Sequence, residues 1–437
     1  MSRDRQGAAG LARWRVGVVE RYFATCARGL EPVVAGELRD LGARDVEPGR
    51  GGVHFRGDKA LLYRANLWLR TAIRVLYPIL EATVTSPDEL YDAVRSVDWS
   101  RYLTPDHTLA VDCNVRDSSI THSQYAALRT KDAICDQFVA RQGRRPSVDV
   151  ERPMVGLNLH IYRNRAVLSL DSSGESLHKR GYRPILTKAP LNEALAAALV
   201  LLTGWRGETA FADPLCGSGT LPIEAAWIAL RRPPGLTRRH FGFMGWMDFD
   251  IELWTALRDE ARRGVRKKLA APIVGSDIRR DAVALANANA RAAGIGHLLH
   301  FEVKDVRDFR PPAGPLTPDP SPPGGGEGKQ AVRPSSPGGG EGKQAVRPSP
   351  PGGGEGKGVR GVILCNPPYG ERIGEEKELK ALYRTLGEVF RQRCAGWLAY
   401  VFTGNARLAR EIGLKPVEQV PLYNGKIPCR LLKFDLT

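Results

Sequence analysis

The sequence lacks the features that would place it in a membrane or in an oxidising compartment. No apolar run approaches the roughly 20 residues that a membrane-spanning helix needs. Residues 1–15 are basic but contain no apolar stretch of the kind found in signal peptides. The 7 cysteines are odd in number and scattered, and no CxxC pair occurs, which argues against a disulfide framework and a structural zinc site. We therefore predict a cytoplasmic protein.

Several catalytic signatures are also missing. The chain has neither the GxGxxG motif of dinucleotide enzymes nor the GxxxxGK[ST] motif of nucleoside triphosphate enzymes. Its 8 histidines show no metal-ligand spacing, and no Ser/His/Asp set stands out. These absences favour chemistry that needs neither a bound metal nor a catalytic triad.

Positive charge, in contrast, is present in excess. Lys and Arg number 64 against 48 Asp and Glu, which gives a formal net charge of +16. This surplus suits a polyanionic partner such as a nucleic acid, because phosphate contacts release condensed counterions. The alternative is that the extra arginines occupy ordinary solvated faces. A length of 437 residues, 42% of them hydrophobic, is enough for two or three globular domains.

The first half of the chain mixes strands and helices. Residues 1–18 are expected to form a disordered tail, and residues 172–190 a polar, basic connection between two domains. Between them, hydrophobic periodicity and turn signals predict an α+β region with a hairpin over Asn164. The expected strands cover 21–25, 53–55, 73–84, 109–115, 155–162 and 166–171, and the expected helices 30–41, 59–68, 87–97 and 123–141.

The second half alternates strands and helices, which predicts a parallel sheet with helices on both faces. The end of the chain differs, because Asn424-Gly425 is a strong hairpin signal and predicts a closing antiparallel pair. The expected strands cover 209–212, 273–276, 299–303, 361–365, 396–403, 417–422 and 427–434, and the expected helices 219–230, 280–293 and 376–394.

A low-complexity repeat interrupts this pattern. The unit PSPPGGGEGKQAVR starts at Pro320, and two similar copies follow it. Each copy consists mainly of proline, glycine and charged residues. Such a unit cannot bury enough apolar surface to offset the entropy lost on ordering. We expect residues 311–358 to form a disordered surface insertion, with an RNA-contacting basic arm as the alternative.

Three acidic positions follow successive strands of the second half. Asp213 opens a glycine-rich turn that includes Gly217 and Gly219, where the backbone can approach a ligand closely. Asp277 ends the next strand, where a carboxylate can accept both ribose hydroxyls of a nucleoside, or can cap the following helix. Asp305 is placed to accept a proton from an adenine amino group, or to serve as a loop or cap aspartate.

The tetrad Asn366-Pro367-Pro368-Tyr369 is the sharpest signal, and it follows an apolar strand. Two prolines stiffen the loop and remove two N–H donors. The side-chain oxygen of Asn366 and the carbonyl of Pro367 can then both accept hydrogen bonds from one exocyclic amino group. Tyr369 offers a ring on which a base can stack. The alternative is a rigid proline turn without chemistry.

Two cysteines flank these turns. Cys216 lies within the glycine-rich turn and Cys365 directly before the tetrad. A methyl-accepting thiol is conceivable at either position, but a packing role is the commoner one for buried cysteines, and we expect no catalytic thiol.

These residues, in this order, resemble the class I methyltransferase fold, and the similarity extends to bacterial THUMP-domain 23S rRNA guanine-N2 methyltransferases. It covers residues 20–437 apart from the repeat insertion. The matching segments are 23–31 (FATCARGLE), 52–55 (GVHF), 63–70 (YRANLWLR), 123–134 (SQYAALRTKDAI), 177–183 (LHKRGYR), 189–198 (APLNEALAAA) and 301–306 (FEVKDV).

The resemblance implies a Rossmann-like catalytic sheet, the cofactor S-adenosylmethionine (SAM) and an RNA substrate, either 23S rRNA or a large-subunit precursor. It implies a ferredoxin-like region at 19–80, a THUMP RNA-binding domain at 81–172, a linker at 173–190 and a catalytic domain at 191–437. Some relatives carry a further domain for guanine N7, and this chain, which stops at Thr437, is expected to lack that activity.

Family roles carry over to individual residues. The resemblance assigns Asp213, Gly217 and Gly219 to SAM, and we expect Cys216 and Asn366 to contribute to the same pocket. It assigns Asp277 to the ribose, Asp305 to the adenine, and the tetrad from Asn366 to Tyr369 to the target base. The candidate RNA contacts, each of which could instead be a solvated charge, are Arg116, Arg129, Lys131, Lys179, Arg180, Arg183 and Arg372.

Three other functions stay open from the sequence. The tetrad is equally compatible with guanine N2 in tRNA or adenine N6 in DNA, although an RNA-binding module argues against DNA. A non-catalytic ribosome-assembly factor is the third reading. Retention of all of the acidic positions and of Asn366 argues against it.

Overall fold

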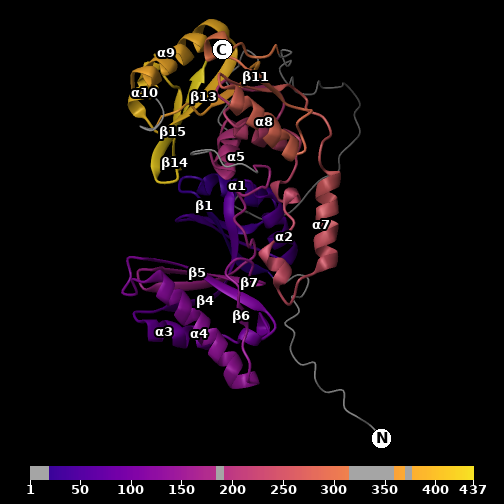
Figure 1. Cartoon of the computed structure of the whole chain (residues 1–437), viewed down its shortest axis with the longest axis vertical. Helices are drawn as coiled ribbons and strands as arrows, with labels where there is room; N and C mark the ends of the chain where they lie inside the picture. The colour runs from indigo at the N-terminus through magenta and orange to yellow at the C-terminus, as the bar shows by residue number, and fades with distance from the viewer. Residues whose placement is uncertain (1–18, 184–190, 314–358, 370–375) are drawn as a thin grey trace, which may run out of the picture.

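The computed structural model describes residues 19–183, 191–313, 359–369 and 376–437. The expected tail at 1–18, the last part of the expected linker, nearly all of the expected insertion and Arg372 lie outside these residues. The described chain forms two sheets, one from each half of the sequence (Figure 1). We find no described helix with both the length and the apolar character needed to cross a bilayer.

The N-terminal half builds one continuous eight-stranded sheet in the order β2-β3-β1-β4-β8-β7-β5-β6. The long strand β4 joins its two parts, because it pairs with β1 on one side and with β8 on the other. The strands are β1 (Glu20–Cys26), β2 (Arg44–Gly49), β3 (Gly52–Gly57), β4 (Ala72–Thr83), β5 (Thr108–Arg116), β6 (Ser147–Val148), β7 (Val155–Tyr162) and β8 (Arg165–Asp171). The helices are α1 (Glu31–Asp40), α2 (Lys59–Trp68), α3 (Pro87–Arg95) and α4 (Ser123–Gln142).

Local signals explain where these elements begin and end. The side chain of Asp58 accepts a hydrogen bond from Leu61 N at the start of α2, and Ser86 accepts one from Glu89 N at the start of α3. The expected hairpin over Asn164 is confirmed, since β7 and β8 pair antiparallel around Asn164 with φ 63°. The strand β2 was missed. It is a largely exposed edge strand without apolar alternation, and it contains Pro48.

The C-terminal half forms a seven-stranded sheet in the order β11-β10-β9-β12-β13-β15-β14. The five strands from β11 to β13 are parallel, and β15 and β14 are antiparallel as expected. The strands are β9 (Ala210–Asp213), β10 (Ile273–Asp277), β11 (His300–Val303), β12 (Gly361–Cys365), β13 (Trp397–Thr403), β14 (Glu418–Asn424) and β15 (Ile427–Asp435). The helices are α5 (Glu193–Leu202), α6 (Thr220–Ala229), α7 (Ile251–Arg263), α8 (Arg280–Ala292), α9 (Glu376–Arg393) and α10 (Ala406–Glu411).

Helices cover both faces of this second sheet, so the expected Rossmann-like fold is confirmed. Buried residues of α5, α6 and α8 share a core with Phe211, Tyr400 and Phe402. Buried residues of α9 and α10 share a second core with Ile363 and Val401 on the opposite face. The strand ends that carry the candidate residues therefore emerge from between two helical layers.

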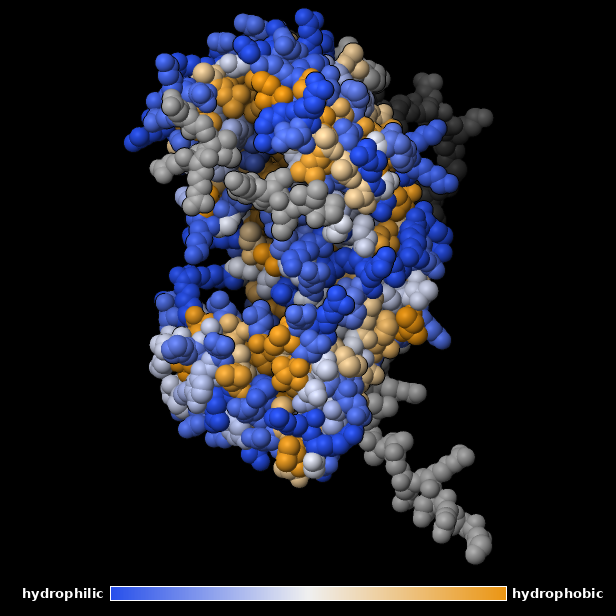
Figure 2. All heavy atoms as spheres, in the orientation of Figure 1, coloured by the Kyte–Doolittle hydropathy of each residue, from blue (hydrophilic) through white to orange (hydrophobic). Residues whose placement is uncertain are grey.

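The segment that follows β8 is packed rather than solvated, which corrects its interpretation as a polar connection. Ser172, Ser173 and Tyr182 are buried, and the side chain of Arg180 is fully buried against Glu224 of α6. Arg180 also donates a hydrogen bond to Arg70 O, which links the two halves of the chain. The first sheet and the second therefore belong to one elongated body, with an N-terminal lobe and a C-terminal lobe (Figure 1). The face of this body shown in Figure 2 carries many hydrophilic residues with apolar ones between them.

Candidate active site

The four predicted loops meet at one edge of the second sheet. Asp213, Asp277 and Cys365 end β9, β10 and β12, and Asp305 lies two residues after β11. These four strands are neighbours in the order β11-β10-β9-β12 and all run parallel. Their carboxyl ends therefore face the same side, which is where open α/β sheets hold ligands.

The glycine-rich turn after β9 requires glycine for two reasons. Gly217 and Gly219 have φ of 51° and 79°, a region that side chains disfavour. A Cβ atom on Gly219 would also lie 3.0 Å from Ala286 Cβ and 3.0 Å from the ring of Phe301. Cys216 N donates to Ser276 O at 2.8 Å, so the turn is fixed to β10. The result is a rigid backbone arc at the N-terminus of α6.

Asp213 is the most deeply buried of the candidate acids, with 1% of its surface exposed. Its Oδ1 accepts a hydrogen bond from Leu215 N at 3.1 Å. Burial, and secondarily the nearby charge of Asp277, raises the pKa of Asp213 well above its usual value. A cationic group beside it would favour the ionised form.

Asp277 shapes the turn instead of capping a helix. Its Oδ2 accepts from Gly217 N at 3.0 Å and its Oδ1 from Arg279 N at 2.9 Å. The N-cap of α8 is Arg279, so the alternative that Asp277 caps this helix is wrong. Its carboxylate therefore lies between the glycine-rich turn and the end of β10.

Asp305 does have a capping contact, as one interpretation predicted. It accepts a hydrogen bond from Arg307 N at 2.8 Å. It also forms an ion pair with the guanidinium of Arg307 at 2.7 Å. These hydrogen bonds lower the pKa of Asp305, so its carboxylate stays ionised. This contact is compatible with a ligand role, because the carboxylate can accept further hydrogen bonds.

The tetrad after β12 contains a buried polar atom without a partner in the part of the chain that the structure describes. Asn366 Oδ1 is buried and makes no hydrogen bond to any described residue. Such an atom is costly unless a ligand or water satisfies it. Asn366 thus has the free acceptor that the sequence predicted for an amino group.

The hydroxyl of Tyr369 is held by two residues that lie far from it in the sequence. Its hydroxyl accepts hydrogen bonds from Asn424 Nδ2 at 2.9 Å and from Cys429 Sγ at 3.8 Å, both on the C-terminal hairpin. The ring contacts Phe402 edge-on, with centroids 6.3 Å apart. Burial raises the pKa of Tyr369, so the hydroxyl keeps its proton. The signal that predicted the hairpin turn gave no indication of this contact.

The two flanking cysteines are buried, and all 7 cysteines are free thiols. Burial raises the pKa of both Cys216 and Cys365 well above the usual thiol value. Neither thiol is therefore a reactive thiolate near neutral pH. This favours packing over methyl acceptance.

The candidate RNA contacts divide into accessible and inaccessible ones. Arg116 and Lys179 have well-exposed side chains, at 62% and 59%, and pair with Asp117 and Glu175, respectively. Arg129 and Lys131 are less exposed and pair with Asp88 and Asp132, respectively.

Two of the expected RNA contacts are wrong. Arg180 is fully buried against Glu224, and the side chain of Arg183 is 5% exposed and pairs with Glu193. The basic LHKRGYR segment reads as exposed in the sequence, but these two guanidinium groups stabilise the packing of the segment. Within the described ranges we find no group of three or more His, Cys, Asp or Glu side chains suited to a metal ion.

Comparison with known protein families matches three successive regions of the chain. Residues 21–76 match the RlmL ferredoxin-like domain, and residues 84–171 match the THUMP domain. Residues 180–316 and 355–433 match the RMKL-like methyltransferase domain.

Whole-chain relatives agree with these matches. The "Putative RNA methyltransferase slr0064" of Synechocystis sp. is 41% identical over 95% of this chain and 96% of its own length. The ribosomal RNA large subunit methyltransferase K/L of Syntrophotalea carbinolica is 45% identical, and this chain spans 53% of that longer protein. The crystal structure of SMU.472 complexed with SAH covers 96% of this chain and 98% of its own, with TM-score 0.79 and 29% identity.

Proposed function

The chain belongs to the RlmK/L-like methyltransferase family, in which a ferredoxin-like region and a THUMP domain precede the methyltransferase domain, and from this premise we propose its reaction. It transfers the methyl group of SAM to the exocyclic N2 amine of a guanine in 23S rRNA or its large-subunit precursor. The proposal depends most on one observation: the buried Oδ1 of Asn366 has no hydrogen-bond partner in the described ranges, and Asn366 follows β12, the neighbour of β9. A cytoplasmic location follows from the substrate.

The residues around the turn fit SAM. When bound, SAM supplies a methyl group that its sulfonium already activates, so the protein mainly has to position the two reactants. The arc from Asp213 through Cys216, Gly217 and Gly219 would hold the methionine part, and the cationic cofactor would stabilise the ionised carboxylate of Asp213. Asp277 would accept from the ribose hydroxyls and Asp305 from the adenine amine.

The tetrad would hold the guanine. Asn366 Oδ1 and the carbonyl of Pro367 would each accept one hydrogen of the N2 amine. Its lone pair, otherwise delocalised into the ring, would then face the methyl group. Pro367 and Pro368 keep the loop stiff. Tyr369, fixed by Asn424 and Cys429, would support the flipped base by stacking.

The domain division is part of the proposal. We assign residues 19–80 to the ferredoxin-like region, 81–172 to the THUMP domain and 191–437 to the catalytic domain. The proposed RNA contacts that remain outside the catalytic edge are Arg116, Arg129, Lys131 and Lys179, of which Arg116 and Lys179 are the most exposed. Their separation from the tetrad would let the N-terminal lobe choose the RNA while the C-terminal lobe modifies it.

The experiment that tests this proposal is nucleoside analysis by mass spectrometry. Purified protein, SAM and a 23S rRNA transcript should yield N2-methylguanosine, and rRNA from a deletion strain should lack one such nucleoside. A product confined to tRNA would transfer the proposal to tRNA, and N6-methyladenine in DNA would refute it. If calorimetry detected no heat of binding when SAM is added, the result would instead favour a non-catalytic assembly factor.

A further inference from the structure

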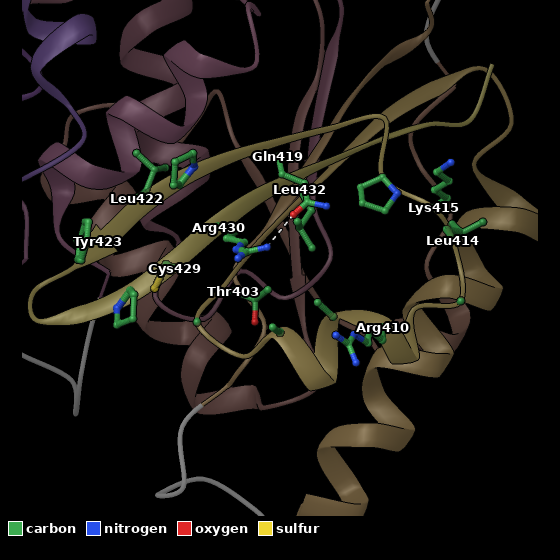
Figure 3. A pocket seen from close by; sticks show the side chains of 17 residues that line it. Thr403, Arg410, Leu414, Lys415, Gln419, Leu422, Tyr423, Cys429, Arg430 and Leu432 are labelled. Atoms are coloured by element: carbon green, nitrogen blue, oxygen red, sulfur yellow. Dashed lines mark hydrogen bonds between the residues drawn. The ribbon is translucent and has the colours of Figure 1, made fainter.

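A cavity of about 770 Å³ lies beside the C-terminal hairpin, and apart from Cys429 its lining residues have no role in the site proposed above. We call it the hairpin hollow and define it by six of its lining residues. These are Thr403, Arg410, Lys415, Gln419, Tyr423 and Arg430. In Figure 3 Gln419 and Arg430 extend from the hairpin, Arg410 comes from the helix α10, and Lys415 comes from the loop that follows this helix.

The hollow lies between α10, the loop that follows α10 and the C-terminal hairpin. Register pairs Gln419 with Leu432, Pro421 with Arg430 and Tyr423 with Pro428, so these side chains share a face. The opposite face carries Leu422 and Cys429, which are buried in the core. On the hollow side, Gln419, Pro421, Pro428 and Arg430 are exposed in the described structure. This face is thus available to a partner.

The charge of the hollow has one sign. Arg410, Lys415 and Arg430 are exposed, and the described lining residues include no Asp or Glu. Glu411 of α10 pairs with Arg384, and Glu418 of β14 pairs with Lys433. Arg430 Nη1 donates to the neutral Gln419 Oε1 at 3.1 Å, a contact that orients the guanidinium without neutralising it. Three cationic side chains beside apolar lining residues provide the contacts that a phosphodiester chain and its bases need.

The hollow borders residues that hold Tyr369 in the proposed base site. It is lined by Thr403, Gly404 and Cys429, and Cys429 contacts the Tyr369 hydroxyl from the other face of the hairpin. A Cβ atom built on Gly404 would lie 2.9 Å from the Tyr369 ring, so this glycine and the ring are in close contact. The hollow and the proposed base site are therefore neighbours that one RNA strand could contact together.

We propose that the hairpin hollow binds the phosphate backbone of the RNA strand that flanks the target guanine, an inference that rests on the proposed function. Arg410, Lys415 and Arg430 neutralise successive phosphates there and hold the strand in register with the tetrad. This is a binding site in the catalytic domain, in addition to any RNA contact made by the N-terminal lobe.

The test measures RNA affinity against salt, separately from turnover. The full-length variant Arg410→Gln/Lys415→Gln/Arg430→Gln is titrated against a fluorescein-labelled single-stranded RNA. Loss of three phosphate contacts should reduce the slope of log K against log[salt] by about 2, and weaken binding about tenfold or more near physiological salt. The matched variant Arg263→Gln/Lys267→Gln/Lys268→Gln loses the same charge from exposed positions at and after the end of α7 and should keep the wild-type slope.

A second measurement uses the unmodified protein. Acetylation footprinting read by mass spectrometry should show Lys415 protected by RNA, and Lys267 and Lys268 unprotected. The inference is overturned if the two triple variants give the same slope of log K against log[salt], or if Lys415 stays reactive toward acetylation when RNA is present. It is also overturned if polyglutamate competes for binding as well as RNA does, which would indicate an acidic protein partner. A changed slope without N2-methylguanosine would refute the proposed reaction alone, and the product with an unchanged slope would refute the hollow alone.

Discussion

At the scale of single residues, the buried acceptor of Asn366 is the feature on which the chemistry depends. We predict that Asn366→Ala lowers kcat by about a hundredfold or more, because the amine loses an acceptor that the site provides when charge develops. Calorimetry should show SAM binding largely intact, since the glycine-rich turn is unchanged. Turnover equal to that of the wild type would remove Asn366 from the mechanism.

Asn424 is a positioning residue for Tyr369, because it donates to the tyrosine hydroxyl at 2.9 Å. We predict that Asn424→Ala lowers kcat/KM for RNA about fivefold, as expected from a lost hydrogen bond of about 1 kcal/mol. In a Tyr369→Phe background the hydroxyl is already absent, so Asn424→Ala should add no further loss. Additive losses in this double-mutant cycle would show that Asn424 acts elsewhere.

Asp213 makes SAM affinity depend on pH. Burial raises the pKa of its carboxyl group, whereas a bound cation favours the ionised form. Binding should therefore release a proton in the range where free Asp213 is protonated, and SAM affinity should rise as pH increases through the raised pKa. Calorimetry in two buffers of different ionisation enthalpy measures this release. Asp213→Asn should abolish it, and proton uptake would contradict the assignment.

At the scale of elements, the packing of α9 against the end of α10 fixes the layer behind the tetrad. A Cβ atom on Gly387 would lie 1.8 Å from Ile412 O, so we predict that Gly387→Ala separates these helices and destabilises the fold by about 1–3 kcal/mol. Gly36 is the matched control in α1. A Cβ atom there meets nothing within 4 Å, so Gly36→Ala should stabilise by about 0.5–1 kcal/mol. Urea denaturation of both variants measures the difference, and equal effects would contradict it.

At the scale of the whole molecule, Arg180 joins the two halves, because it pairs with Glu224 and donates a hydrogen bond to Arg70 O. Burial alone would lower the pKa of Arg180, but the carboxylate of Glu224 more than offsets this and raises it, so the guanidinium stays charged. We predict that Arg180→Met destabilises the protein by about 3–5 kcal/mol, because the buried Glu224 loses its direct ion-pair partner and keeps only the weaker influence of Arg70. The double variant Arg180→Met/Glu224→Gln should recover part of this loss, since the amide still accepts from Tyr182. A double variant less stable than Arg180→Met, judged from urea midpoints, would show that the charge is not the cause.

Short-range patterns in the sequence allowed much of the fold and of the candidate site to be predicted. Alternation of strands and helices indicated the parallel sheet, Asn424-Gly425 indicated the closing hairpin, and the four loop tips followed from their places after strands. These features depend on residues a few positions apart, which is the range over which periodicity and turn chemistry operate. The roles of Asp213, Asp277, Asp305 and Asn366 toward ligands remain predictions.

Only the tertiary structure decided which charges are buried and which distant segments touch. It buried Arg180 and Arg183 in a segment that reads as exposed, and merged two regions into one sheet through β4. It also brought Asn424 and Cys429 to Tyr369 across 55 and 60 residues. Burial and long-range pairing are set by how whole elements pack, so a local stretch of sequence determines that an arginine is charged but not what it faces.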